Sequence, residues 1–321
     1  MEATIFVVNE EPYCLWERDT AARNLEFLNG LDPDYFEYSL NTHLAAEDDK
    51  RASVALRVSL HHSIETLFSL LGAFIQAPDC AYAWLAKCSN SDLRTLVERI
   101  AKRAPAIYTK LNLSSITWKS VAESVFAAYK PGTDRQTNTV DRFSGLWDAL
   151  SRELIEPALV DEYNSLKHGF RVSPGGFSLA VGLEHEPGTA PPPSEMRLLG
   201  KSEFGATFFK IETLWPEQKS RSVRSRRVSA NWSIERIILL HQLTQMSIGN
   251  LVSALKFVNG VPANECRYVR PEKDADFDEP WKHSTGITAI NLDDVVDHTN
   301  ARVVTKQELL NRLTNRDRSG R

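Results

Sequence analysis

A short stretch near the middle of the chain, DEYNSLKHGFRV (161–172), brings together residues capable of acid–base chemistry. Asn164 and His168 lie four residues apart and share one face of a helix, and Lys167 adds a cation beside them. Histidine can take or give a proton near neutral pH, an amide can orient it, and lysine can hold an anionic group. The same residues also suit the end of a helix, where cations in the last turn and a following glycine, Gly169, are favoured.

A second polar group lies on a long helical pattern nearer the N-terminus. Arg57, His61 and Glu65 recur every four residues and form one polar line beside an apolar stripe. Glu65 has apolar neighbours, and an unpaired buried carboxylate would be costly, so we expect it to have a partner. That partner is either Arg57 or His61 on the same helix, or the polar group of the first stretch, whose histidine Glu65 would orient. The candidate catalytic residues are His168, Asn164, Lys167, Glu65 and Arg57.

A basic run, KSRSVRSRR over 219–227, contains five cations and no acidic residue. It follows a strand-like pattern and precedes a helical one, so we expect it to form an exposed loop. Such a loop is either simply solvated or binds phosphate backbones, where each cation adds affinity without reading the sequence. The candidate nucleic-acid-binding residues are Lys219, Arg221, Arg224, Arg226 and Arg227.

The composition is that of an average soluble globular protein. Hydrophobic residues make up 42% of the chain and the net charge is −4, so any nucleic-acid contact requires a local basic patch. The sequence has no run of eighteen apolar residues and no N-terminal signal pattern, which predicts a protein without a membrane span. Four cysteines stand at scattered, unpaired positions, as is typical of a reducing compartment, and we therefore expect the cytoplasm.

The motifs of several common chemistries are missing from the sequence. His61 and His62 are adjacent and point to different helix faces, and no histidine pair has the spacing of a zinc site. Neither the G-x-x-x-x-G-K-[ST] loop nor the G-x-S-x-G elbow occurs, which argues against P-loop nucleotide hydrolysis and α/β-hydrolase chemistry. We expect neither a metal nor a cofactor.

The hydrophobic periodicity predicts a mainly α chain: an antiparallel helical bundle with a small antiparallel β insertion, α+β overall. One long helix is expected from about residue 46 to Pro78, and another over 137–168 that kinks or breaks near Pro157. A period of two predicts strands over 176–184 and 204–215.

Five segments follow from these patterns. The acidic run at 272–281 reads as a linker, and Thr305 and Glu308 have the spacing of a capping box that begins a short helix. The segments are an N-terminal segment (1–46), the helical bundle (47–172), the β-rich insertion with its basic loop (173–232), a closing helix that packs on the bundle (233–260), and a polar C-terminal tail (261–321).

A helical bundle whose long helix carries Asn-x-x-x-His near one end resembles the HEPN superfamily of nucleic-acid-associated helical domains, here over roughly residues 47–172. Catalytic members carry an arginine, a polar residue and a histidine, and two copies meet across a dimer to cleave RNA. Asn164 and His168 match the polar residue and the histidine, whereas Tyr163 stands at the arginine position. Tyrosine lacks the charge that would hold a scissile phosphate, so the resemblance implies a divergent or catalytically inactive member.

Two other arginine–histidine pairs have the literal spacing of that motif. Arg57 and His62 are one pair, Arg236 and His241 the other, and an apolar residue follows each arginine where a polar one is expected. Neither pair is a better match than Asn164 and His168.

Three hypotheses about function follow. The leading one is an interaction or RNA-associated module without robust catalysis, with RNA, a protein partner or a second copy as the partner. The main alternative is a metal-independent endoribonuclease of toxin or antiviral-defence type, in which His168 would be the acid–base group. The third is a scaffold in which all these polar residues are structural.

Overall fold

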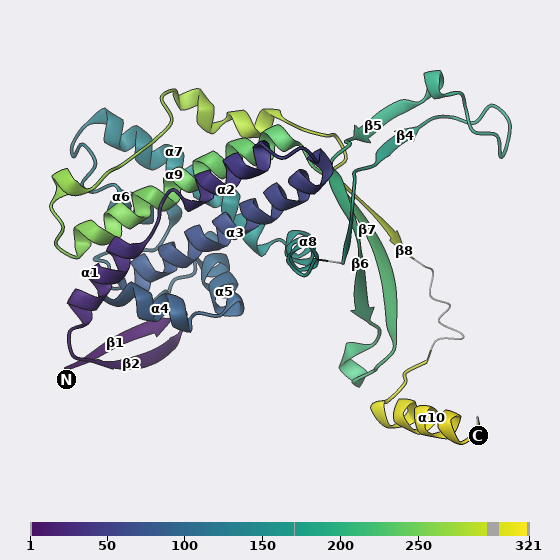
Figure 1. The fold of residues 1–321 in the computed structure, drawn as a ribbon, viewed down its shortest axis with the longest axis horizontal. Coiled ribbons are helices and arrows are strands. Elements are labelled where there is room, and N and C mark those ends of the chain that lie inside the picture. Colours follow the sequence, from purple (N-terminus) through teal and green to yellow (C-terminus); the bar gives the residue numbers. More distant parts are fainter. Residues whose placement is uncertain (1, 170, 294–301, 320–321) are drawn as a thin grey trace. The chain divides into compact units, whose positions relative to one another are not determined.

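The computed structural model describes residues 2–169, 171–293 and 302–319 and has a mixed α+β architecture in which helix prevails over strand. Its contacts divide the chain into two compact units. Figure 1 labels the helices and strands of both. Unit 1 is Met1–Asn164 with Ile234–Ser284, and unit 2 is Ser165–Ser233 with Thr285–Arg321. The chain therefore leaves unit 1 within a helix and returns to it at the start of another.

Unit 1 is mostly helical and also contains a two-stranded hairpin. Helix α3 is central, because it contacts α2, α4, α5, α7 and α9. The elements of unit 1 are β1 (Glu2–Val8), β2 (Glu11–Glu17), α1 (Thr20–Gly30), α2 (Tyr35–Leu44), α3 (Asp49–Gln76), α4 (Ala81–Lys87), α5 (Asn90–Ala101), α6 (Trp118–Val125), α7 (Asp134–Ile155), most of α8 (Pro157–Lys167), α9 (Ile234–Val258), and short 3₁₀ turns that include η5 (Asp274–Phe277) and η6 (Glu279–Lys282).

The apolar stripe of α3 forms much of the core of unit 1. The helix begins after Asp48, whose side chain accepts a hydrogen bond from the backbone N–H of Arg51, as an N-cap does. Leu60, Phe68 and Phe74 are at most 1% exposed, and burial of each such side chain stabilises the fold by about 1.5–3 kcal/mol. Among the described helices α3 is the one long and apolar enough to cross a membrane, yet 72% of its most apolar window is buried inside the protein.

The predicted break in the helical pattern at Pro157 is confirmed. Helix α7 ends at Ile155, Glu156 is extended, and α8 begins at the proline. A residue before proline is driven out of the α region by steric contact with the proline ring, which explains why Glu156 separates the two helices.

The first 46 residues contain more regular structure than their mixed pattern predicts. Strand β1 pairs antiparallel with β2 over its whole length. Helices α1 and α2 were not predicted, because each is short and buries few residues. Leu28 is a buried residue of α1, and Leu40 is a buried residue of α2. Two or three apolar positions give no helical periodicity that can be distinguished from chance.

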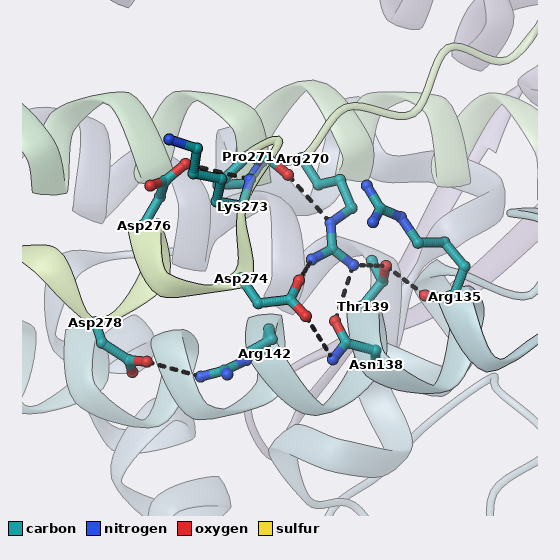
Figure 2. A network of polar contacts seen from close by, with 10 residues as sticks. All are labelled: Arg135, Asn138, Thr139, Arg142, Arg270, Pro271, Lys273, Asp274, Asp276 and Asp278. Atoms are coloured by element: carbon teal, nitrogen blue, oxygen red, sulfur yellow. Dashed lines mark hydrogen bonds and ion pairs between the residues drawn. The ribbon is translucent and has the colours of Figure 1, made fainter.

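The acidic segment at 272–281 is not a linker. It folds into η5 and η6, buries Phe277, and contacts α7 and α9. Figure 2 shows how its polar side chains tie it to α7. Arg270, whose side chain is 4% exposed, donates to Asn138 Oδ1 (2.9 Å) and Thr139 Oγ1 (2.7 Å) and pairs with Asp274. The linker prediction was wrong because it rested on the acidic composition of the segment, whereas a few residues with specific contacts hold the segment to unit 1.

We expect Arg270→Met to lower the free energy of unfolding by about 2 kcal/mol, because it leaves buried acceptors without their charged donor. Hydrogen exchange should then be faster across 271–282. Arg142→Met is the matched control, since Arg142 joins the same segment to α7 through Asp278 at 2.9 Å but at the surface, where ion pairs contribute little. Equal exchange rates in the two variants would contradict this role of Arg270.

Unit 2 is built around a four-stranded antiparallel sheet with strand order β3-β6-β7-β8. Gly205 is required where β6 meets β7, because a Cβ there would lie 2.0 Å from the carbonyl oxygen of Ala230. The elements are β3 (Val172–Pro174), β4 (Ser178–Val181), β5 (Arg197–Lys201), β6 (Gly205–Thr213), β7 (Val223–Asn231), β8 (Ala289–Asp293) and α10 (Lys306–Ser319), and β4 pairs with β5 as a separate hairpin.

The basic run at 219–227 is only partly a loop, which corrects the prediction. Lys219 lies in a turn with a φ of +52°, whereas β7 begins at Val223 and contains Arg224, Arg226 and Arg227. A strand forms here because β6 and β8 pair with it on both sides. Those long-range hydrogen bonds outweigh the low intrinsic preference of a charged run for strand.

Candidate functional site

A buried cluster of charged residues joins α3 to α7 and α8 within unit 1. The Arg57 Nε donates to Glu162 Oε1 at 2.6 Å, and its Nη2 lies 3.5 Å from Glu153 Oε2. His61, one turn further along α3, has its Nε2 3.4 Å from the same Glu162 oxygen. All four side chains are at most 10% exposed. Two residues on α3 therefore hold two carboxylates that come from other helices.

The charges of this cluster stabilise one another. Burial alone would favour the neutral form of Glu162, but the Arg57 charge and the hydrogen bond with His61 lower the pKa of Glu162 to about 2. Burial and then the Arg57 charge lower the pKa of His61, so the imidazole is neutral at pH 7. For Arg57, burial is outweighed by the two carboxylates, which raise its pKa. The cluster thus holds one guanidinium between two carboxylates at neutral pH.

Arg236 extends the cluster to α9. Its Nη2 donates to Glu153 Oε1 at 3.0 Å, and its guanidinium lies 5.0 Å from the centre of the Trp281 ring. The ring face attracts the cation, and the carboxylate fixes its direction. Arg236 was noted in the sequence only for its spacing from His241, and the structure gives it an ion-pair partner instead.

Tyr163, which stands at the arginine position of the HEPN motif, also packs against α3. Its ring stacks on His61, with centroids 5.0 Å apart and planes inclined by 23°. Its hydroxyl is hydrogen-bonded to Glu65, and burial together with the Glu65 charge raises the pKa of the phenol. Glu65 therefore has a partner, as expected, but this partner is Tyr163 on α8 and not Arg57, His61 or the polar group around His168.

The space next to the cluster is too small for a substrate. A cavity of about 10 Å³ is lined by His61, Arg94, Glu153 and Tyr163 together with four apolar residues. That volume is about what one water molecule occupies. Arg94 Nε and Glu153 Oε2 are buried without a hydrogen-bond partner among the described atoms.

The predicted catalytic residues are thus in different environments. Arg57 is buried between carboxylates, Glu65 is bonded to Tyr163, and Asn164 is half-buried on α8 in unit 1. Lys167 and His168 are exposed at the end of α8, in unit 2. Gly169 follows with a φ of +68°, the left-handed conformation that glycine adopts after a helix.

Neither Glu153 nor Glu162 was predicted as a site residue from the sequence. Each is a carboxylate on a helix whose neighbouring turns carry apolar residues, the same signal that identified Glu65. The sequence does not show that Glu162 pairs with Arg57, because the two residues are 105 positions apart in the chain.

The two faces of the sheet in unit 2 differ in charge. On one face Arg224 donates to Glu212 Oε2 at 3.0 Å, and Arg226 lies 3.2 Å from Glu212 and 2.5 Å from Asp293. The pKa of Glu212 is lowered, chiefly by its hydrogen bond with Arg224. On this face three cations, Lys210, Arg224 and Arg226, share the two carboxylates Glu212 and Asp293, so Arg224 and Arg226 are not free cations.

The other face is open and largely apolar. Phe209, Arg227 and Leu292 lie directly opposite one another on β6, β7 and β8. Phe209 is 64% and Leu292 57% exposed, and Ile211 and Val223 extend the surface along the strands. Within the described part of the chain, no carboxylate lies within 4.0 Å of the Arg227 guanidinium. We call these five residues the open sheet face.

Comparisons of the chain with protein-family models, with curated proteins and with solved structures give no significant match. Over the described residues, no group of three or more His, Cys, Asp or Glu side chains is arranged so that it could hold a metal ion.

Proposed function

We propose that this chain is a cytoplasmic, HEPN-like module, an antiparallel helical bundle with a β insertion, that binds single-stranded RNA without robust catalysis. The observation that supports RNA binding most directly is the row Phe209–Arg227–Leu292 on the open sheet face. An exposed aromatic ring on a sheet can stack on a base, and an adjacent arginine without a carboxylate partner can hold the phosphate.

Two further cations support the same surface. Lys219 and Arg221 are exposed in the connection that leads into β7, at the end of the strand where Val223 begins the open sheet face. Of the five cations predicted to bind nucleic acid, we propose that Lys219, Arg221 and Arg227 contact the RNA. Arg224 and Arg226 do not, because each is paired with a carboxylate.

The surroundings of Arg57 support the absence of catalysis. A phosphodiester-cleaving site needs a cation that can reach the substrate, and Arg57 is instead buried between Glu153 and Glu162. Tyr163, the counterpart of the HEPN arginine, is half-buried and bonded to Glu65. The endoribonuclease alternative would have to rely on His168 with a phosphate clamp from elsewhere, such as Lys167 or a second copy of the chain.

We expect Phe209→Ala to weaken binding of a single-stranded RNA about tenfold, since base stacking contributes about 1–3 kcal/mol. Arg227→Glu should weaken RNA binding and make the plot of log K against log salt less steep, with a slope smaller in magnitude by about 1 or more. Fluorescence anisotropy with a labelled oligonucleotide at several salt concentrations measures both. Arg224→Gln is the matched control on the same strand, because its cation already serves Glu212, and it should leave affinity nearly unchanged.

The alternatives give different results in the same samples. Unchanged affinity in Phe209→Ala and Arg227→Glu would refute the open sheet face as the RNA site. RNA cleavage in EDTA that disappears in His168→Ala would support the endoribonuclease. A wild-type protein that neither binds nor cleaves RNA would leave the scaffold hypothesis.

A further inference from the structure

A groove of about 520 Å³ lies on unit 1, between α2, α9 and the segment 265–269. One face of α9 forms its floor through residues three or four apart, including Gln245, Met246, Gly249 and Lys256. Its volume falls within the range of small-molecule sites, about 300–1,000 Å³. None of the residues discussed for RNA binding or for the buried charge cluster lines it.

The third wall of the groove is held in place by buried polar side chains of α9. Asn250, which is fully buried, donates to the carbonyl of Val269 and accepts from its N–H, both at 2.7 Å. Ser253 Oγ donates to the carbonyl of Arg267 at 2.6 Å. These bonds fix the backbone of the wall, so the groove is preformed.

Gly249 gives the floor its depth. A Cβ built at this position would meet no atom within 4 Å, so no packing contact requires a glycine there. Glycine inside a helix is about 1 kcal/mol less favourable than alanine. Gly145 in α7 is equally open but lies at the solvent surface, outside the groove.

Opposite charges are separated along the groove. Glu37, on α2, accepts a hydrogen bond from Gln245 Nε2 at 3.1 Å, and Asp34 lies near it on the same wall. Lys256 follows Gln245 by eleven residues, about 16 Å along a helix. Lys256 and Arg267 have no carboxylate within 4.0 Å among the residues that the structure describes, although the exposed Glu265 also lines the groove.

We propose that this groove binds a short peptide with free termini. Its protonated amine lies at Glu37 and Asp34, and its carboxylate lies at Lys256 and Arg267. An extended chain advances about 3.3–3.6 Å per residue, so a separation of about 16 Å fits four to five residues. The apolar lining around Met246 covers the middle of the peptide, which favours aliphatic side chains there. This inference is independent of RNA binding.

Titration calorimetry with the peptide Ala-Leu-Leu-Ala tests the proposal, together with its N-acetylated and C-amidated forms. We expect the free peptide to bind, and blocking either terminus to weaken binding about tenfold, equivalent to 1.4 kcal/mol for each lost charge contact. In the double variant Lys256→Gln/Arg267→Gln, amidation should no longer change the affinity.

Gly249→Leu should abolish binding by filling the floor, whereas Gly145→Leu should bind like the wild type. Both substitutions replace an open helix glycine by a better helix former, so both variants should fold, as circular dichroism would show. The proposal is overturned if the free peptide shows no binding at about 10 mM, a concentration that would reveal even a Kd of 1 mM. Equal affinity for the free and end-blocked peptides, or unchanged binding by Gly249→Leu, would overturn it as well.

Discussion

Arg57→Met is expected to lower the free energy of unfolding by about 3–5 kcal/mol, because it leaves Glu153 and Glu162 buried with less compensating charge. Glu162→Gln should also be destabilising, because it removes the carboxylate nearest to Arg57 and leaves the buried guanidinium with Glu153. Urea denaturation followed by circular dichroism measures both values. The slope of the transition should stay unchanged, since neither substitution alters the surface that unfolding exposes.

The double variant separates a pair interaction from two independent losses. If the two residues act as a pair, Arg57→Met/Glu162→Gln should be markedly more stable than the sum of the single effects predicts. Arg51→Met provides the control on the same helix, because Arg51 pairs with Asp48 at the surface, with its side chain 86% exposed. Two results would contradict this role of the cluster. One is a free energy of unfolding in the double variant that equals the sum of the single effects, and the other is a decrease in Arg51→Met as large as that in Arg57→Met.

Acidification is expected to destabilise the fold in two stages. His241 is fully buried, its Nε2 is hydrogen-bonded to Ser59 Oγ at 2.9 Å, and burial lowers its pKa to about 4. Between pH 6.5 and 4 the unfolded chain therefore binds a proton that the folded chain does not, and stability falls by up to about 3 kcal/mol. The lowered pKa of His61 acts in the same direction.

The second stage comes from Glu162. Because its folded pKa is about 2 and its unfolded pKa is near 4.5, its contribution is complete above pH 4.5 and is lost as the pH falls towards 2. Urea midpoints at a series of pH values resolve the two stages. His241→Gln should flatten the stage between pH 6.5 and 4, and Glu162→Gln the stage below pH 4.5. An identical pH profile in wild type and His241→Gln would refute the first assignment.

The buried charge cluster shows how residues suited to catalysis can serve structure. Arginine, histidine, tyrosine and two glutamates are a set from which acid–base sites are made. Here every charge has a partner, and the adjoining cavity of about 10 Å³ holds no more than a water. The two ligand sites that we propose are therefore elsewhere, on the open sheet face and in the groove along α9.

The long helices could be predicted from the sequence alone. Helices α3 and α9 bury an apolar stripe along most of their length, so a period near 3.6 recurs often enough to exceed chance. The break before Pro157 and the glycine after α8 follow from local sterics, which act within a few residues. Hydrophobic periodicity and local steric effects depend on residues that are close together in the chain. The sequence by itself therefore determines where these helices form and where they end.

The partners of the polar residues were decided by the tertiary structure. Glu65 was expected to need a partner, but Tyr163 could be identified only once α8 was packed on α3. Arg226 and Arg227 are adjacent in the sequence, yet one is neutralised by Glu212 and Asp293 while the other is open. Strand alternation sends them to opposite faces, and strands far away in the chain supply the carboxylates to one face only. Charge pairing acts through space between distant segments, so the register of the folded chain, and not the local pattern, determined which of these residues is available to a ligand.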